Sequence, residues 1–275
     1  MKNLKKLAMI LLSMLLVLAL AGCGDSKAPA EETPAEEAPA EETPAEETPA
    51  EEAPAEEAPA EFPEVMSYEE FMAADVDTPV TVETYVQAKQ GWWEKDGQGV
   101  ITLYTQNEDG AYFLYNAACT EEESEKLVPG TKLLVKGFKA EWSGEIEIID
   151  ATFEIIEGSF VAEPRDITEK FGTDEMADFL NQHVSFTGLT VEDKGEGKAF
   201  LYNYDGSGEK GDDLYFDVSL NGTTYTFVVE SYLCGQDSDV YKAVEGLKVG
   251  DVIDVEGFLY WYEGAQLHTV SVTVK

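Results

Sequence analysis

The chain has 275 residues, of which 18 are Lys or Arg and 56 are Asp or Glu, giving a formal net charge of −38. This length is sufficient for one or two folded domains. A surface this acidic repels phosphate backbones and anionic lipid headgroups, so the composition argues against a protein that holds nucleic acid in a basic groove.

The first residues have the order of an export signal. Three Lys residues precede an apolar run over residues 7–20, which is shorter than a typical membrane span. A Leu-Ala-Gly-Cys motif then ends at Cys23. The segment resembles a bacterial lipoprotein signal peptide with its lipobox. The resemblance implies that residues 1–22 are removed and that Cys23 carries a diacylglycerol, which would anchor the protein to the cell membrane, facing away from the cytoplasm. The alternative is a secreted protein with a free cysteine.

The segment 23–64 is predicted to be a disordered stalk. It repeats the pentads APAEE and TPAEE, and residues 28–64 contain 14 Glu and no Lys or Arg. Proline in every pentad prevents a helix, adjacent Glu residues repel each other, and no large apolar residue precedes Phe62 in the repeat. As a stalk, the segment would hold the folded part away from the membrane. The alternative is a low-complexity linker without a function of its own, which would have the same composition.

The first folded domain is predicted over residues 65–157. Ser67 and Thr120 are each followed three residues later by Glu, a capping-box pattern that starts two short helices. The apolar periodicity predicts strands from residue 80 to the Trp92–Trp93 pair, over 99–105 and over 111–118, and a closing hairpin over 127–156.

The second domain, residues 173–275, repeats this order after a linker over 158–172. Asn221-Gly222 has the signature of a tight hairpin turn. The predicted elements are a helix over 173–182, strands over 183–192, 199–204, 214–220 and 223–233, a helix from Asp237 to Gly246, and a closing hairpin over 250–274.

One stretch occurs in both domains. Residues 127–148 (LVPGTKLLVKGFKAEWSGEIEI) align without a gap with residues 247–268 (LKVGDVIDVEGFLYWYEGAQLH) at a shift of 120 positions. The alignment places Gly137 on Gly257. It predicts that the two domains are related and close with the same hairpin.

Three strands, a helix and two strands is the element order of an OB-fold. Residues 66–274 therefore resemble the tandem OB-like domains of bacterial surface lipoproteins. The resemblance implies a mainly β fold of two five-stranded Greek-key barrels with short helices. Nucleic-acid-binding members of the fold have a basic groove, whereas residues 65–275 carry 14 basic and 41 acidic residues.

Strand aromatics are the candidate ligand-binding residues, because OB-folds bind through strands two and three and the adjacent loops. Ordinary packing is the alternative for each of them. Adjacent strand residues face opposite ways, so one of Trp92 and Trp93 is expected to leave the core. The candidates are Trp92, Trp93, Tyr104, Tyr202, Tyr204 and Trp261.

The only metal candidate is a glycine-rich acidic loop. Its oxygen-bearing side chains suit Ca²⁺, but the loop does not fit the EF-hand pattern, and a solvated acidic loop is the favoured interpretation. These side chains are Asp205, Ser207, Glu209, Asp212 and Asp213. Cys119 and Cys234 hold equivalent places in the two domains, which favours buried thiols over a disulfide.

The sequence predicts a non-catalytic, membrane-anchored extracellular binding module for a glycan, peptide or small ligand. Catalytic residues, cofactors other than the lipid, and a nucleic-acid partner are not expected. The alternatives are a structural spacer or assembly subunit and, disfavoured by charge, a nucleic-acid-binding OB protein.

Overall fold

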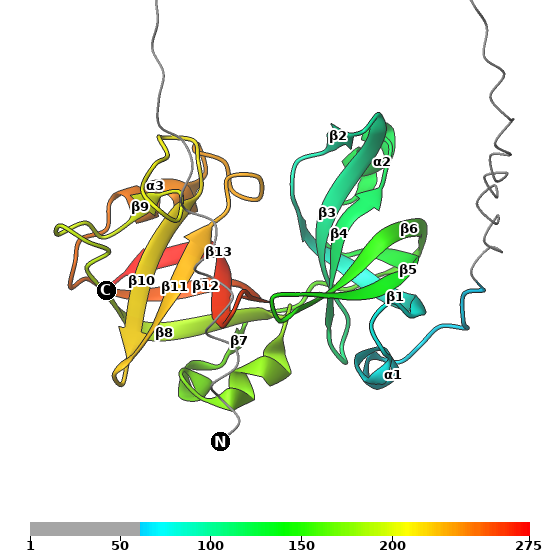
Figure 1. The fold of residues 1–275 in the computed structure, drawn as a ribbon, viewed down its shortest axis with the longest axis horizontal. Coiled ribbons are helices and arrows are strands. Elements are labelled where there is room, and N and C mark those ends of the chain that lie inside the picture. Colours follow the sequence, from blue (N-terminus) through cyan, green and yellow to red (C-terminus); the bar gives the residue numbers. More distant parts are fainter. Residues whose placement is uncertain (1–60) are drawn as a thin grey trace, which may run out of the picture. The chain divides into compact units, whose positions relative to one another are not determined.

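The computed structural model describes residues 61–275 of the chain (Figure 1). The predicted signal peptide, Cys23 and nearly all of the predicted stalk lie outside these residues. Within residues 61–275, no helix is both long and apolar enough to cross a membrane. The described part is mainly β and forms two barrels that follow each other along the chain.

The first barrel follows the short helix α1 (Tyr68–Ala73). Its strands are β1 (Pro79–Lys89), β2 (Trp93–Lys95), β3 (Gln98–Gln106), β4 (Ala111–Ala118), β5 (Thr131–Trp142) and β6 (Glu145–Ser159), and helix α2 (Glu121–Lys126) connects β4 to β5. The sheet has the order β1-β5-β6-β4-β3-β2, and pairing of β1 with β3 closes it.

The second barrel begins with the short strand β7 (Arg165–Asp166) and two 3₁₀ helices, η1 (Thr168–Lys170) and η2 (Asp174–Phe179). Its other strands are β8 (His183–Val191), β9 (Leu201–Tyr202), β10 (Leu214–Leu220), β11 (Thr223–Val229), β12 (Val252–Trp261) and β13 (Ala265–Val274), with helix α3 (Asp239–Glu245) between β11 and β12. The order is β7-β8-β12-β13-β11-β10-β9, and pairing of β8 with β10 closes the barrel.

Both barrels have the OB topology, so the predicted fold class is confirmed. In each, apart from the short strands β2, β7 and β9, three strands precede a helix and two follow it, and the third and fifth of these five strands are parallel. The parallel contact is short: two residue pairs join β4 to β6, and a single pair joins β11 to β13.

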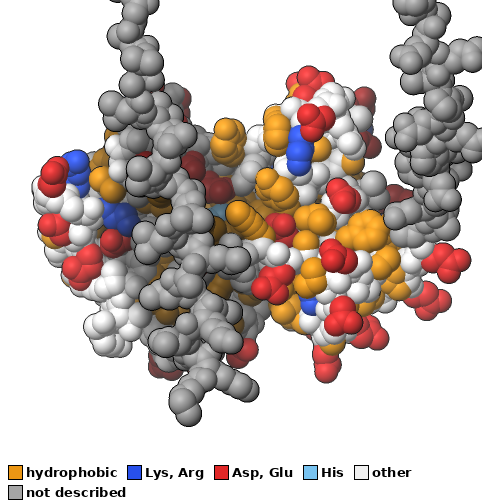
Figure 2. Space-filling view, in the orientation of Figure 1, with side chains coloured by type: hydrophobic (Ala, Val, Ile, Leu, Met, Phe, Trp, Pro, Cys, Tyr) orange, Lys and Arg blue, Asp and Glu red, His pale blue; other side chains and the backbone are white. Residues whose placement is uncertain are grey.

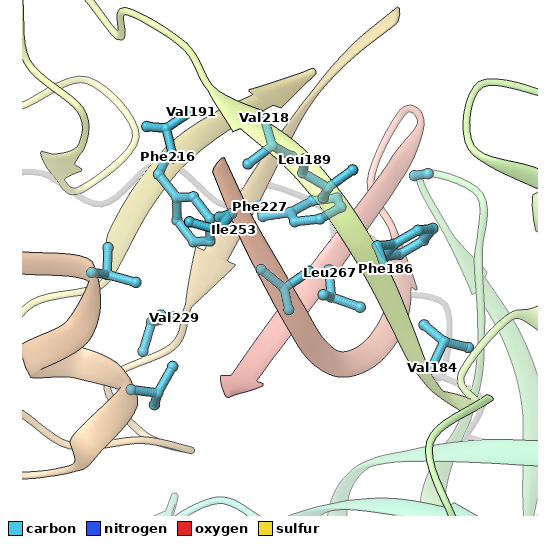
Figure 3. Close-up of a cluster of buried hydrophobic side chains, with 14 of the residues drawn as sticks. Val184, Phe186, Leu189, Val191, Phe216, Val218, Phe227, Val229, Ile253 and Leu267 are labelled. Atoms are coloured by element: carbon cyan, nitrogen blue, oxygen red, sulfur yellow. The ribbon is translucent and has the colours of Figure 1, made fainter. Parts of the chain in front are cut away.

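Each barrel has its own apolar core. Alternating residues of the strands point inward, as expected for strands with one buried face. In the second barrel, Phe186, Phe216 and Phe227 pack with Leu267 at the centre (Figure 3). Phe171, from the segment predicted as a linker, is buried in the same core. The first core is built around Phe71, Tyr112 and Leu114.

Gly137 and Gly257 occupy the same point of the two barrels. A Cβ on Gly137 would lie 2.6 Å from Ile148 Cγ2, and a Cβ on Gly257 would clash with the carbonyl oxygen of His268. The register of the closing hairpin shifts at both glycines. Only glycine lets the paired strands approach this closely. Because Ile148 and His268 are themselves 120 positions apart, the sequence repeat is a repeat of structure.

Of the predictions for single helices and strands, some are confirmed and others differ from the structure. The capping boxes at Ser67 and Thr120 are both formed. The helix predicted over 173–182 is instead the 3₁₀ helix η2, because the hydroxyl of Thr173 donates to Lys170 O and does not cap the segment. The strand predicted over 199–204 is reduced to the two residues of β9.

Candidate functional site

An open cleft of about 840 Å³ lies on the β3–β4 face of the first barrel. Its first-barrel residues come from β2, β3, β4, β6 and the end of β5, which include strands two and three and the loop regions that OB-folds commonly use for binding. The second barrel contributes residues of β12 and β13 and of the segment after β11. The cleft therefore joins the customary binding face of one barrel to a surface of the other.

Aromatic rings form most of the cleft walls. Trp93, Tyr115 and Trp142 line it and keep 44–45% of their surface exposed. Tyr232 and Tyr260 line it from the second barrel. Exposed rings of this kind are free to stack on a flat ligand, because no core requires their surface.

Buried polar groups from both barrels form the floor of the cleft. The Tyr104 hydroxyl lies 2.7 Å from His268 Nδ1 and donates to Glu230 Oε2 at 3.1 Å. Gln90 Nε2 also donates to Glu230 Oε2. The imidazole of His268 stacks on Tyr260 with 4.3 Å between ring centroids. This network links β3 of the first barrel to β13 of the second.

The floor is largely neutral apart from Glu230. Burial lowers the pKa of His268, and the nearby Glu230 only partly opposes this effect. At neutral pH the His268 imidazole is therefore uncharged, and its contact with Glu230 at 3.8 Å is not a salt bridge. Burial also raises the pKa of Tyr104 well above its usual value. The arrangement can offer hydrogen bonds to a ligand.

The tips of the two closing hairpins meet beside the cleft. Ser143 O accepts a hydrogen bond from Glu263 N, and the Trp142 ring meets the Tyr262 ring edge-on. Glu145 is completely buried at this contact, where Trp261 N donates to its Oε2 at 2.9 Å. Its Oε1 has no partner among the described residues. Burial raises the pKa of Glu145 to about 8.

The structure brings one of the six predicted aromatics, Trp93, to the cleft lining. Tyr104 is buried beneath the cleft and contacts the lining residues Glu230 and His268. Trp92 packs on the first core and donates from Nε1 to Cys119 O, so the two tryptophans do face different environments.

The other three predicted aromatics lie outside the cleft lining. Tyr202 donates to Glu245 Oε1, next to helix α3. Tyr204 is 75% exposed in the loop after β9. Trp261 packs over Gly144 and against the second core.

The acidic loop that was considered as a Ca²⁺ candidate uses its carboxylates locally. Asp205 accepts from Ser207 N, Asp212 accepts from Glu209 N, and Asp213 accepts from Ser231. Among the residues that the structure describes, no three His, Cys, Asp or Glu side chains are grouped so as to hold a metal ion.

The two cysteines of the described part are both free thiols. Cys119 is buried and Cys234 is half-buried, so no disulfide joins the barrels. Burial raises the pKa of each thiol to about 11.

Sequence reasoning missed most of the cleft. Phe113 and Tyr115 alternate along β4, and Trp142 is the repeat partner of Tyr262; both patterns are readable in the chain. Glu147, Glu230 and His268 give no comparable signal, because only the contact between the barrels brings them together.

No protein-family model matches the chain, and no curated protein matches it. Solved structures of similar fold include a murine DNA-binding protein bound to double-stranded DNA, with 12% identity and a TM-score of 0.35 over 71% of this chain and 96% of that one. Another is a replication protein A heterotrimer bound to single-stranded DNA, with 10% identity and a TM-score of 0.34 over 77% of this chain and 52% of that one. A third is the Ifi202 HINa domain with double-stranded DNA, with 16% identity and a TM-score of 0.31 over 73% and 96%.

These matches disagree with one part of the functional prediction. A module for a glycan, peptide or small ligand with no nucleic-acid partner was expected, whereas the matched proteins are described as bound to DNA. The expectation that nucleic acid is not a partner rested on net charge, which is an average over the whole surface. Acidic side chains are indeed spread over the face shown in Figure 2, whereas the cleft lining contains only Glu147 and Glu230.

Proposed function

We propose that the two barrels form a non-catalytic unit that binds single-stranded nucleic acid by stacking bases on the aromatic walls of the cleft. The observation that carries this proposal is the position of the exposed rings. Trp93, Tyr115 and Trp142 converge on strands two and three and the flanking loops of the first barrel, where an OB-fold holds a strand of bases. The volume of the cleft is typical of ligand sites.

The charge of the protein determines how such binding works. Basic proteins gain affinity by releasing counterions from phosphates, and they lose it as salt rises. Residues 65–275 contain 14 basic and 41 acidic residues, so they cannot gain affinity in this way. The bases would enter the cleft and the phosphates would point to solvent. Added salt would then screen the repulsion, so affinity should stay constant or increase with salt.

Fluorescence anisotropy of the full chain with a labelled single strand tests the proposal. Tyr115→Ala should weaken binding by about 1–3 kcal/mol, the usual contribution of one base–aromatic stack. Tyr204→Ala is the matched control, because this tyrosine is equally free to stack but lies outside the cleft lining. Equal losses in both variants, or affinity that falls steeply with salt, would contradict the proposal.

The lipid anchor is a separate proposal that rests on the sequence alone. A diacylglycerol on Cys23 would tether the barrels to a membrane through the Pro- and Glu-rich segment. The binding proposal does not depend on it.

A further inference from the structure

Glu147 lines the cleft, and no group among residues 61–275 donates a hydrogen bond to its carboxyl group. Glu147 is 8% exposed and lines both the cleft and an adjoining groove of about 550 Å³. Among residues 61–275 its side chain forms no ion pair, in contrast to the cleft's other carboxylate, Glu230, which accepts from Gln90 and Tyr104. A carboxylate this buried is costly unless donors reach it. The missing donors would come from a ligand.

Asn116 presents the complementary group. It follows Tyr115 on β4, has a positive φ of 51°, and lines the same cleft and groove as Glu147. Its amide nitrogen Nδ2 is buried and has no acceptor within the described part of the chain. A ligand that reaches both groups must therefore offer donors to a carboxylate and an acceptor to an amide NH₂.

We propose that Glu147 and Asn116 select guanine among the bases that enter the cleft. The Watson–Crick edge of guanine has two adjacent donors, N1–H and the N2 amino group, which match the two oxygens of a carboxylate. Its O6 is an acceptor for the Asn116 amide. Adenine and cytosine place a ring acceptor beside their amino group, and uracil and thymine place acceptors on both sides of a single N–H, so each of them would set a lone pair against Glu147. This inference rests on the proposed function.

Single strands that differ at one base test the selection in the wild-type full chain. The strands carry guanine, inosine, adenine or cytosine at one central position. Binding is measured by anisotropy at mildly alkaline pH, because burial raises the pKa of Glu147. Inosine keeps N1–H and O6 but lacks the N2 amino group. Guanine should bind about tenfold more tightly than inosine, the order expected for a bidentate base contact. Adenine and cytosine should be weaker still.

Two variants then assign the preference to Glu147. Glu147→Gln presents one donor and one acceptor instead of two acceptors, so it should lose the preference for guanine over inosine. Glu154→Gln is the control, because Glu154 lies on the same strand, is exposed and carries the same charge. It should keep the preference.

The outcomes separate this inference from the proposed function. If all four strands bind the wild type equally, the guanine inference is overturned and base stacking stands. If none of the four strands binds the wild type, both the guanine inference and the proposed function are overturned. Loss of the guanine preference in Glu154→Gln as well would remove the assignment to Glu147. If Glu147→Gln fails to fold, the comparison of guanine with inosine in the wild-type protein still tests whether the cleft selects guanine.

Discussion

Replacing Glu145 by Gln should remove a large part of the pH dependence of stability. The side chain is fully buried where the two hairpin tips meet, and its Oε1 has no partner among the described residues. Burial raises its pKa from 4.5 to about 8, an effect that the Asn181 side chain and the Trp261 N–H partly oppose and that the nearby Glu147 carboxyl reinforces. Glutamine has the same shape, can still accept from Trp261 N, and does not ionise.

The sign of the effect follows from proton binding. Between pH 4.5 and about 8 the folded protein holds the Glu145 proton and the unfolded chain does not. Stability therefore falls as pH rises through this window. Each pH unit corresponds to about 1.4 kcal/mol, so the whole window corresponds to on the order of 5 kcal/mol. His183 and His268 act in the opposite direction below pH 6.5, because burial lowers the pKa of each.

Urea unfolding at a series of pH values measures the effect. Between pH 6.5 and 8 the histidines no longer contribute, so the wild type should lose about 2 kcal/mol and Glu145→Gln should lose little of it. Glu154→Gln, an exposed change on the same strand, should behave as the wild type. Parallel stability curves for the wild type and Glu145→Gln above pH 6.5 would refute the assignment of a raised pKa to this carboxyl.

Three further predictions concern other parts of the chain. Gly257→Ala should destabilise the protein by about 1–3 kcal/mol in urea unfolding, because its Cβ would meet His268 O, whereas Gly264→Ala, with open space around it, should be nearly neutral. Tyr104→Phe should cost about 1–2 kcal/mol in the same assay by removing the hydroxyl that joins the floor network. Cys23→Ala should release the protein from the membrane fraction or leave its signal uncut, as fractionation and mass spectrometry would show.

The sequence was sufficient for the fold because its signals are local. The 120-residue repeat, the glycine at each hairpin crossing and the Ser67 and Thr120 caps each act within one barrel. The order of strands and helix then leaves few topologies other than the OB-fold.

The site could not be derived in the same way. Tyr104 and His268 are 164 positions apart and meet only because the barrels contact each other. Glu145 and Glu147 look like ordinary solvent-facing carboxylates of a hairpin until the second barrel covers the hairpin tip. No periodicity in one barrel predicts which of its faces the other barrel will bury.

The short parallel contact in each barrel has a consequence for local opening. In each barrel the third and fifth strands are joined by only one or two residue pairs, and these pairs include Phe113, Glu147 and His268, which line the cleft. These two short seams therefore border the same cavity, and amide hydrogen exchange should be faster there than in the long β5–β6 and β12–β13 ladders. A ligand held across the cleft would close both seams at once. Its binding should slow exchange in β4, β6, β11 and β13 together, including in strands that it does not touch.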